Sequence, residues 1–178
     1  PLIDTSSVNT ASASWSQCSS LTSFPLIDTS NISNLSFAWD GCVGFTTFPT
    51  IDTSSATVLG SSWKGCTGIT TFPSLDFSSC TDFRSTWMNC ISLTTFPANQ
   101  FDSTGTLISN AFNNSWASCA LTAQSIENIL TSLDTNGAQN NVLVIAYGSN
   151  AAKSTWSTAA NTAYTNLINK GWTITYNS

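Results

Sequence analysis

The chain has 178 residues, of which only 7% are charged, and its formal net charge is −5. Its four Lys and Arg residues leave no basic surface that could follow a phosphate backbone, so the composition argues against nucleic-acid binding. Histidine is absent, which removes the commonest general base, the commonest metal ligand and every Ser-His or Cys-His nucleophile.

A sequence pattern recurs every 24 residues through the first two thirds of the chain. Self-similarity at such a period indicates stacked units, because each unit can bury its apolar face only against a neighbour. The first unit has no earlier neighbour in this sequence, so we expect further repeats or a partner to precede it. The pattern is marked by the five prolines, namely Pro1, Pro25, Pro49, Pro73 and Pro97.

Four regular units run from Pro1 to Phe96, and each divides in the same way. A short predicted strand ends in Phe-Pro, where proline is tolerated because it no longer has to donate a ladder hydrogen bond. A turn with Ile-Asp or Leu-Asp follows, and then a mostly helical return of about a dozen residues that ends in Trp-x-x-Cys. A fifth, irregular unit keeps Trp116 and Cys119. Residues 1–121 are therefore predicted to form a solenoid.

A different pattern begins at Thr122, which is typical of a helix N-cap. Apolar residues then recur on one helical face until Asn136-Gly137 ends the helix. The uninterrupted apolar run 142–147 predicts a buried strand. The face of the first helix is formed by Ile126, Ile129, Leu130 and Leu133.

A second, longer helix is expected from about Ala151 to Lys170, with Gly171 just past its end. Residues 172–176 alternate between apolar and polar, as a half-exposed final strand does. Residues 122–178 are thus predicted to form a C-terminal α/β cap of helix, strand, helix and strand, continuous with the solenoid. The apolar stripe of the second helix comprises Trp156, Ala159, Ala160, Ala163, Tyr164, Leu167 and Ile168.

The repeats resemble a known family. The run 38–49, AWDGCVGFTTFP, is similar to the core of BspA-type leucine-rich repeats, although Trp39 stands where those repeats usually carry Phe. The run 28–35, DTSNISNL, resembles the signature of related bacterial surface repeats, and 170–175 resembles the segment that follows such repeats in bacterial and phage surface proteins. The resemblance covers residues 1–121. It implies a right-handed, leucine-rich-repeat-like α/β solenoid at a cell or virion surface.

The Trp-x-x-Cys pairs raise the possibility of a metal or redox site. Zinc requires four ligands that converge on one point, whereas one cysteine per repeat gives a column of parallel side chains. Disulfides between repeats would need Cβ atoms about 3.8 Å apart and aimed at each other. We therefore expect no metal and no cofactor, and interpret Cys18, Cys42, Cys66 and Cys90 as free core thiols, with Cys80 in a further core position and the tryptophans buried.

Aspartates also recur in register, at Asp4, Asp28, Asp52 and Asp76. Calcium between repeats would need six to eight oxygen ligands, and one Asp per repeat supplies few of them. The favoured interpretation is that each Asp begins an Asp-x-Ser turn and accepts backbone N–H bonds. No pair of acids suggests a general acid and base.

The residues before each Phe-Pro form the candidate binding surface. If the phenylalanines point inward, alternation sends the residue directly before each of them outward, and the residue before that lies beside it, so that two columns of hydroxyl groups form. Such a face suits a ligand rich in hydroxyls, ice or another protein; alternatively, Thr is present only because it favours strands. The candidate residues are Thr22, Ser23, Thr46, Thr47, Thr70, Thr71, Thr94 and Thr95.

These features predict a non-enzymatic extracellular recognition or adhesion module of a bacterial or phage surface protein. It would bind a protein or glycan on a host or neighbouring surface through the repeat face, without nucleic acid and without membrane insertion. The alternative is a structural subunit of a virion or extracellular filament, which contacts copies of itself.

Overall fold

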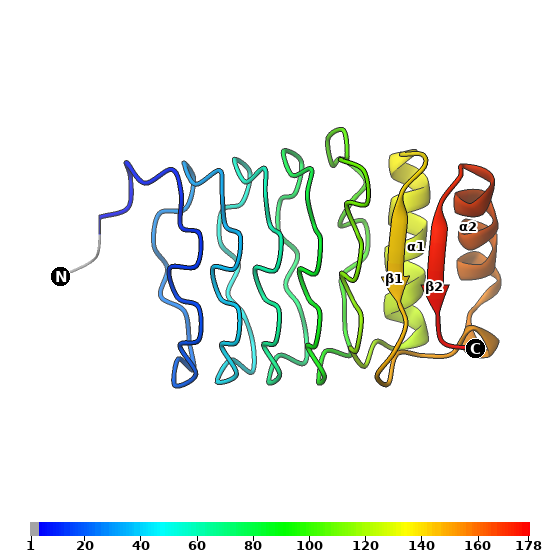
Figure 1. Ribbon diagram of the computed structural model, residues 1–178, viewed down its shortest axis with the longest axis horizontal. Coiled ribbons are helices and arrows are strands. Elements are labelled where there is room, and N and C mark those ends of the chain that lie inside the picture. Colours follow the sequence, from blue (N-terminus) through cyan, green and yellow to red (C-terminus); the bar gives the residue numbers. More distant parts are fainter. Residues whose placement is uncertain (1–3) are drawn as a thin grey trace.

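The computed structural model describes residues 4–178, so the predictions that rest on Pro1 and Ile3 lie outside the described residues. All the regular helices and strands of the described chain follow Thr122 (Figure 1). They are helix α1 (Ala123–Asn136), strand β1 (Val142–Ile145), the short 3-10 helix η1 (Lys153–Thr155), helix α2 (Thr158–Asn169) and strand β2 (Thr173–Tyr176).

The α/β solenoid predicted from the repeats is wrong. Within residues 4–121 the structure forms neither the strand expected before each Phe-Pro nor the helical return. This part of the chain consists of turns and bends joined by isolated β-bridges. The described chain has two α-helices and one two-stranded parallel sheet, and it lacks the strand and helix that would define a leucine-rich-repeat-like coil in each repeat.

The backbone between residues 35 and 42 shows why the helical return does not form. Phe37 and Trp39 donate their N–H groups to carbonyls 23 residues further along the chain, at 3.0 and 2.9 Å. Ala38 and Asp40 instead donate to the carbonyl three residues back, both at 3.1 Å. Phe37 and Gly41 have left-handed φ angles of 57° and 73°. An α-helix needs every N–H to reach the residue four positions back, so this alternation excludes it.

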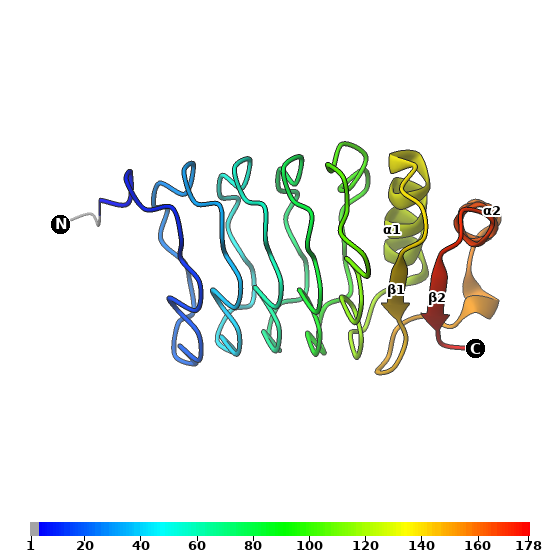
Figure 2. The same ribbon diagram turned by 45° about the horizontal axis from the view of Figure 1, so that its top comes forward.

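Stretches of chain 24 residues apart lie side by side in both views of the molecule (Figures 1 and 2). Parallel bridges join them, as in the series Thr10, Asn34, Val58 and Asp82. We call residues 4–24, 25–48, 49–72 and 73–96 the first to fourth segments. Side chains at equivalent positions of neighbouring segments are thereby brought into contact.

Stacked aromatic rings fill the core. Neighbouring tryptophan rings along the chain stack with centroids 4.9–6.2 Å apart, within 13° of parallel. The prediction of a buried tryptophan column is confirmed for Trp39, Trp63 and Trp87, whose exposure is 0%. Trp15 is only half-buried. Since the same buried cluster extends from Ala11 to Ile174, the two predicted regions share one core.

The first element of the C-terminal part forms as predicted. The Thr122 side chain accepts a hydrogen bond from the Ser125 N–H, which makes it the N-cap of α1, and Gly137 closes the helix with a left-handed φ of 80°. The four predicted apolar residues of α1 are buried. Strands β1 and β2 pair in parallel, with Val142 opposite Thr173.

The single long helix predicted from Ala151 to Lys170 is wrong. The chain forms η1, becomes extended at Trp156 with ψ 142°, and starts α2 only after Ser157, whose hydroxyl accepts from the Ala160 N–H. A serine N-cap competes well with continued helix because it satisfies a free N–H group. The predicted stripe is also too wide, since Ala159 and Ile168 are exposed.

Candidate functional site

The predicted binding residues lie directly before the buried phenylalanines of the four segments. Phe24, Phe48, Phe72 and Phe96 are at most 5% exposed. The residue before each of them faces solvent, as predicted, but the strict alternation of a strand does not hold, because Thr46 and Thr47 are both exposed between the buried Phe45 and Phe48. Of the eight candidates, seven are exposed and Thr94 is half-buried. We call these eight residues the hydroxyl band: Thr22, Ser23, Thr46, Thr47, Thr70, Thr71, Thr94 and Thr95.

Backbone hydrogen bonds between segments hold the hydroxyl band in register. Thr47, Thr71 and Thr95 are joined in turn by parallel bridges. The Thr70 N–H donates to the Thr46 carbonyl at 3.3 Å, and the Thr94 N–H donates to the Thr70 carbonyl at 2.9 Å. Neighbouring parallel backbones lie about 4.8 Å apart, so the band presents hydroxyl and methyl groups at that repeat.

The hydroxyl band lies next to a layer of packed aromatic rings. The rings of Phe24 and Phe48 stack at 5.8 Å, and those of Phe72 and Phe96 at 5.6 Å. Each phenyl ring also meets a tryptophan edge to face, as in the 4.8 Å pair of Trp39 and Phe48. Such pairs contribute about 0.5–1.5 kcal/mol each beyond the area that they bury. The band therefore lies over closely packed rings.

The hydroxyl band meets the start of helix α1 at Thr94. The Thr122 N–H and the Ser125 hydroxyl both donate to the Thr94 carbonyl, at 3.1 and 2.9 Å. The Thr94 hydroxyl donates to the Thr70 carbonyl at 3.1 Å. Thr94 is thus engaged inside the protein and contributes less to the surface than the sequence predicted.

The repeated aspartates act in turns, as predicted. Asp28 Oδ1 accepts from the Ser30 N–H at 3.0 Å and from the Ser30 hydroxyl at 2.6 Å. Asp4 and Asp52 hold Ser6 and Ser54 in the same way. The serine hydroxyl bond, and then the backbone bond, lower the pKa of Asp4, Asp28 and Asp52 below 3.8. These carboxylates therefore serve to hold the turns by accepting hydrogen bonds from the serine two residues on.

The cysteine column is part of the core, but it also makes polar contacts that the sequence analysis missed. The predicted core position is confirmed for Cys42, Cys66 and Cys90, which are 0% exposed, and it is wrong for Cys18, which is exposed in the first segment. Each buried thiol donates to a tryptophan carbonyl 27 residues earlier, as Cys66 does to Trp39 at 3.1 Å. Burial raises the pKa of Cys66 and Cys90 far above that of a free thiol. Such thiols are poor nucleophiles, because the thiolate is the reactive form.

The side chains of the hydroxyl band can form hydrogen bonds and apolar contacts with a ligand. Its eight residues offer hydroxyl donors and acceptors and methyl groups, and none of them carries charge at neutral pH. Over residues 4–178, no three Cys, Asp or Glu side chains gather where they could hold a metal ion. Nor does any helix within that range have the length and apolar character needed to cross a membrane.

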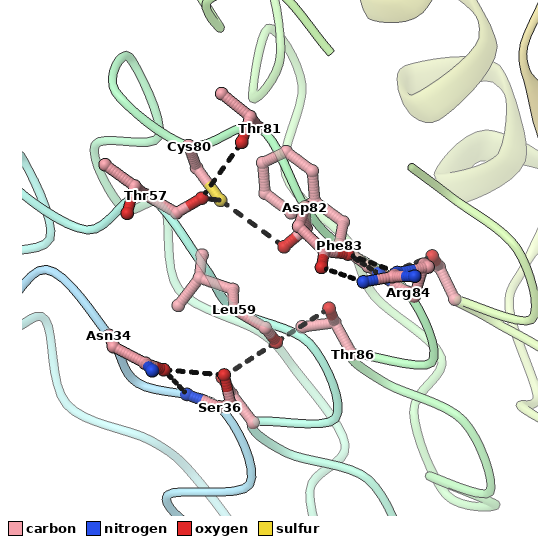
Figure 3. A network of polar contacts seen from close by, with 12 residues as sticks. Asn34, Ser36, Thr57, Leu59, Cys80, Thr81, Asp82, Phe83, Arg84 and Thr86 are labelled. Atoms are coloured by element: carbon pink, nitrogen blue, oxygen red, sulfur yellow. Dashed lines mark hydrogen bonds and ion pairs between the residues drawn. The ribbon is translucent and has the colours of Figure 1, made fainter. Parts of the chain in front are cut away.

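Sequence reasoning missed both ion pairs of the described residues, Lys170 with Asp134 and Arg84 with Asp82, and the second of these lies in the fourth segment (Figure 3). The Asp82 carboxylate is 8% exposed and contacts the Arg84 guanidinium at 2.6 Å. The two preceding segments carry Asn34 and Val58 at the position equivalent to Asp82. The sequence did carry a signal for this pair, because Asp82 is the only charged residue in the column of Thr10, Asn34, Val58 and Asp82.

The chain was compared with protein-family models, with curated proteins and with solved structures, and none of these comparisons gave a match.

Proposed function

We propose that this chain is a non-enzymatic recognition module of an extracellular protein, which binds a glycan or protein on a host or neighbouring surface through the hydroxyl band. The observation that carries this proposal is the exposure of seven of the eight candidate side chains in one backbone register. The likeness of its repeats to bacterial surface repeats supports a place on a bacterial cell or a phage particle.

Binding through the hydroxyl band would add up over several segments. Each segment offers the same pair of small polar side chains, so each contact is weak by itself. A ligand that repeats on a similar scale can engage several pairs at once, and its affinity then exceeds that of any single contact. Because the band carries no charge, we expect binding to depend little on salt.

The proposal is tested on a glycan array and by surface binding with the intact protein. The triple variant Thr47→Lys, Thr71→Lys and Thr95→Lys places bulky charge on three segments of the hydroxyl band. A matched control carries Ser7→Lys, Ser55→Lys and Ser79→Lys, which are exposed serines at one other register position. We expect the first variant to lose binding and the control to keep it. Equal binding by both would contradict the proposed role of the band.

A second function, that of a self-assembling structural subunit, is favoured by a different observation. The carbonyls of Asn34 and Ser36 accept N–H groups from the first segment at 2.9 Å. Their equivalents in that segment, Thr10 and Ser12, accept no such bond from residues 4–178. Either a further repeat or a second copy of this chain can pair with these carbonyls. Sedimentation velocity over a range of concentrations tests this function. If the triple variant of the hydroxyl band still forms oligomers as concentration rises, the self-assembling function is favoured, because these contacts do not use the band.

A further inference from the structure

A shallow groove crosses three consecutive segments, apart from the hydroxyl band. It encloses about 360 Å³, within the range of about 300–1,000 Å³ that is usual for small-molecule sites. Its lining comes from equivalent register positions, with Ser36 and Phe37 in the second segment and Gly60 and Ser61 in the third. Asp82 and Arg84 complete it from the fourth segment (Figure 3).

Gly60 creates the hollow. Ser12, Ser36 and Arg84 occupy the same position in the other segments, so Gly60 alone lacks a side chain there. A Cβ atom added at Gly60 would lie 3.7 Å from the Arg84 carbonyl and 3.8 Å from Asp82 Oδ2. These are ordinary contact distances, which means that the groove has room for a larger group beside the carboxylate.

Phe37 forms one wall in an unfavourable backbone conformation. Its φ of 57° is left-handed, and its side chain is 45% exposed. The equivalent left-handed positions hold Ala13, Ser61 and Ser85, which are small. A bulky residue with positive φ is an outlier that costs of order 1–3 kcal/mol, and such strain is concentrated at functional sites. An exposed ring that is retained despite this cost points to a contact with a ligand.

Asp82 and Arg84 line the groove from the fourth segment. The Arg84 Nε donates to Asp82 Oδ1 at 2.9 Å, and Nη2 donates to Oδ2 at 2.6 Å. The Asp82 side chain is 8% exposed, whereas that of Arg84 is 55% exposed. A guanidinium has five N–H groups, so donors remain on the exposed side of Arg84. The pair has no net charge and offers both donors and an acceptor.

We propose that this groove binds a neutral hexose unit of a glycan. The Phe37 ring would pack against the apolar C–H face of the sugar, and the Asp82–Arg84 pair would take two neighbouring hydroxyl groups as acceptor and donor. Charge-assisted bonds of this kind are about twice as strong as neutral ones. Ser36 and Ser61 supply further hydroxyls. An anionic sugar is disfavoured, because Asp82 offsets Arg84 and the chain carries a net charge of −5.

This site shares no residue with the hydroxyl band and does not rest on its proposed role. The test is saturation-transfer NMR with the methyl glycosides of glucose, galactose and mannose, and with sialic acid. Gly60→Gln fills the groove, and the register-matched control Ser12→Gln lies outside it. Phe37→Ser is a second variant, which installs the residue that Ser61 and Ser85 already provide in this conformation.

We expect at least one neutral glycoside to bind, Gly60→Gln and Phe37→Ser to weaken it at least tenfold, and Ser12→Gln to leave it unchanged. The triple variant of the hydroxyl band should still bind the glycoside, which separates the two sites. Thermal unfolding of Phe37→Ser shows whether its fold is kept. The inference is overturned if no glycoside binds, if sialic acid binds best, or if both groove variants bind as the wild type does.

Discussion

Each tryptophan of the core combines extensive packing with an unsatisfied polar group. The indole N–H groups of Trp39, Trp63, Trp87 and Trp116 are buried without a hydrogen-bond partner among the described residues. An unpaired buried donor costs about 1–3 kcal/mol. The stacked and edge-to-face rings around each indole offset this cost. The column is therefore maintained by ring packing.

Truncation of one inner tryptophan should accordingly be severe. Trp63→Ala removes a side chain of 0% exposure and is expected to lower the free energy of unfolding by about 3–5 kcal/mol. Trp15→Ala is the matched control, because Trp15 occupies the same position but is half-buried. Urea unfolding measures both. Equal losses for the two variants would contradict the burial described for the column.

The aspartate turns make stability depend on acid pH. The pKa of Asp28 is lowered from 3.8, chiefly by the Ser30 hydroxyl and then by its N–H. A carboxylate with a lowered pKa stabilises the fold above its unfolded pKa, and this contribution is lost as pH falls through the folded value. We expect the stability of the wild type to fall below about pH 4. Asp28→Asn should reduce that fall, and the equivalent turns of Asp4 and Asp52 should keep part of it.

Ser30→Ala provides the matched test of the cause. It removes the hydroxyl donor but keeps the backbone N–H, so the pKa of Asp28 should rise toward its ordinary value and the pH dependence should be intermediate. Thermal melts from pH 2.5 to pH 7 record all three proteins. Identical pH profiles would mean that the turn does not hold the carboxylate.

At the level of the elements, local signals predicted more than distant ones. Thr122 and Gly137 gave the ends of α1 correctly, because a cap depends on residues a few positions away. The exposure of Thr47 and Thr71 was also predicted correctly, but the strand alternation used to predict it is absent, since Thr46 and Thr70 are exposed as well.

The helical return was wrong for the opposite reason. The spacing of Leu35, Ala38, Trp39 and Cys42 fits one face of a helix, and all four are buried. The same spacing arises when backbone N–H groups bond alternately to the carbonyl three residues back and to a carbonyl of the next segment. The groove also escaped prediction, since it depends on Gly60 lying between residues of two other segments.

A cation–π cluster joins η1, α2 and β2. The Lys153 ammonium lies 3.6 Å from the Tyr164 ring centroid and 4.8 Å from that of Tyr176, so η1 contacts both α2 and β2. Such a contact is worth about 0.5–2 kcal/mol. Lys153→Met keeps the apolar stem and should lower stability by about that amount. A double-mutant cycle with Tyr164→Leu should show coupling, and strict additivity would refute the contact.

At the scale of the whole molecule, the chain combines one continuous apolar core with a surface of few charges. The buried cluster passes from the turn-rich segments into the packing of α1 and α2. With 7% charged residues, the surface is hydrated mainly by Ser, Thr and Asn. A broad, repetitive surface with few charges is suited to recognition by many weak contacts.

The most direct test of that claim is a graded series on the hydroxyl band. Thr71→Lys, then Thr47→Lys with Thr71→Lys, then the triple variant are compared by surface binding to the partner found with the wild type. Our account predicts stepwise weakening with each substituted segment, while the melting temperatures stay close to that of the wild type. Unchanged binding of the triple variant, or complete loss with Thr71→Lys alone, would contradict it.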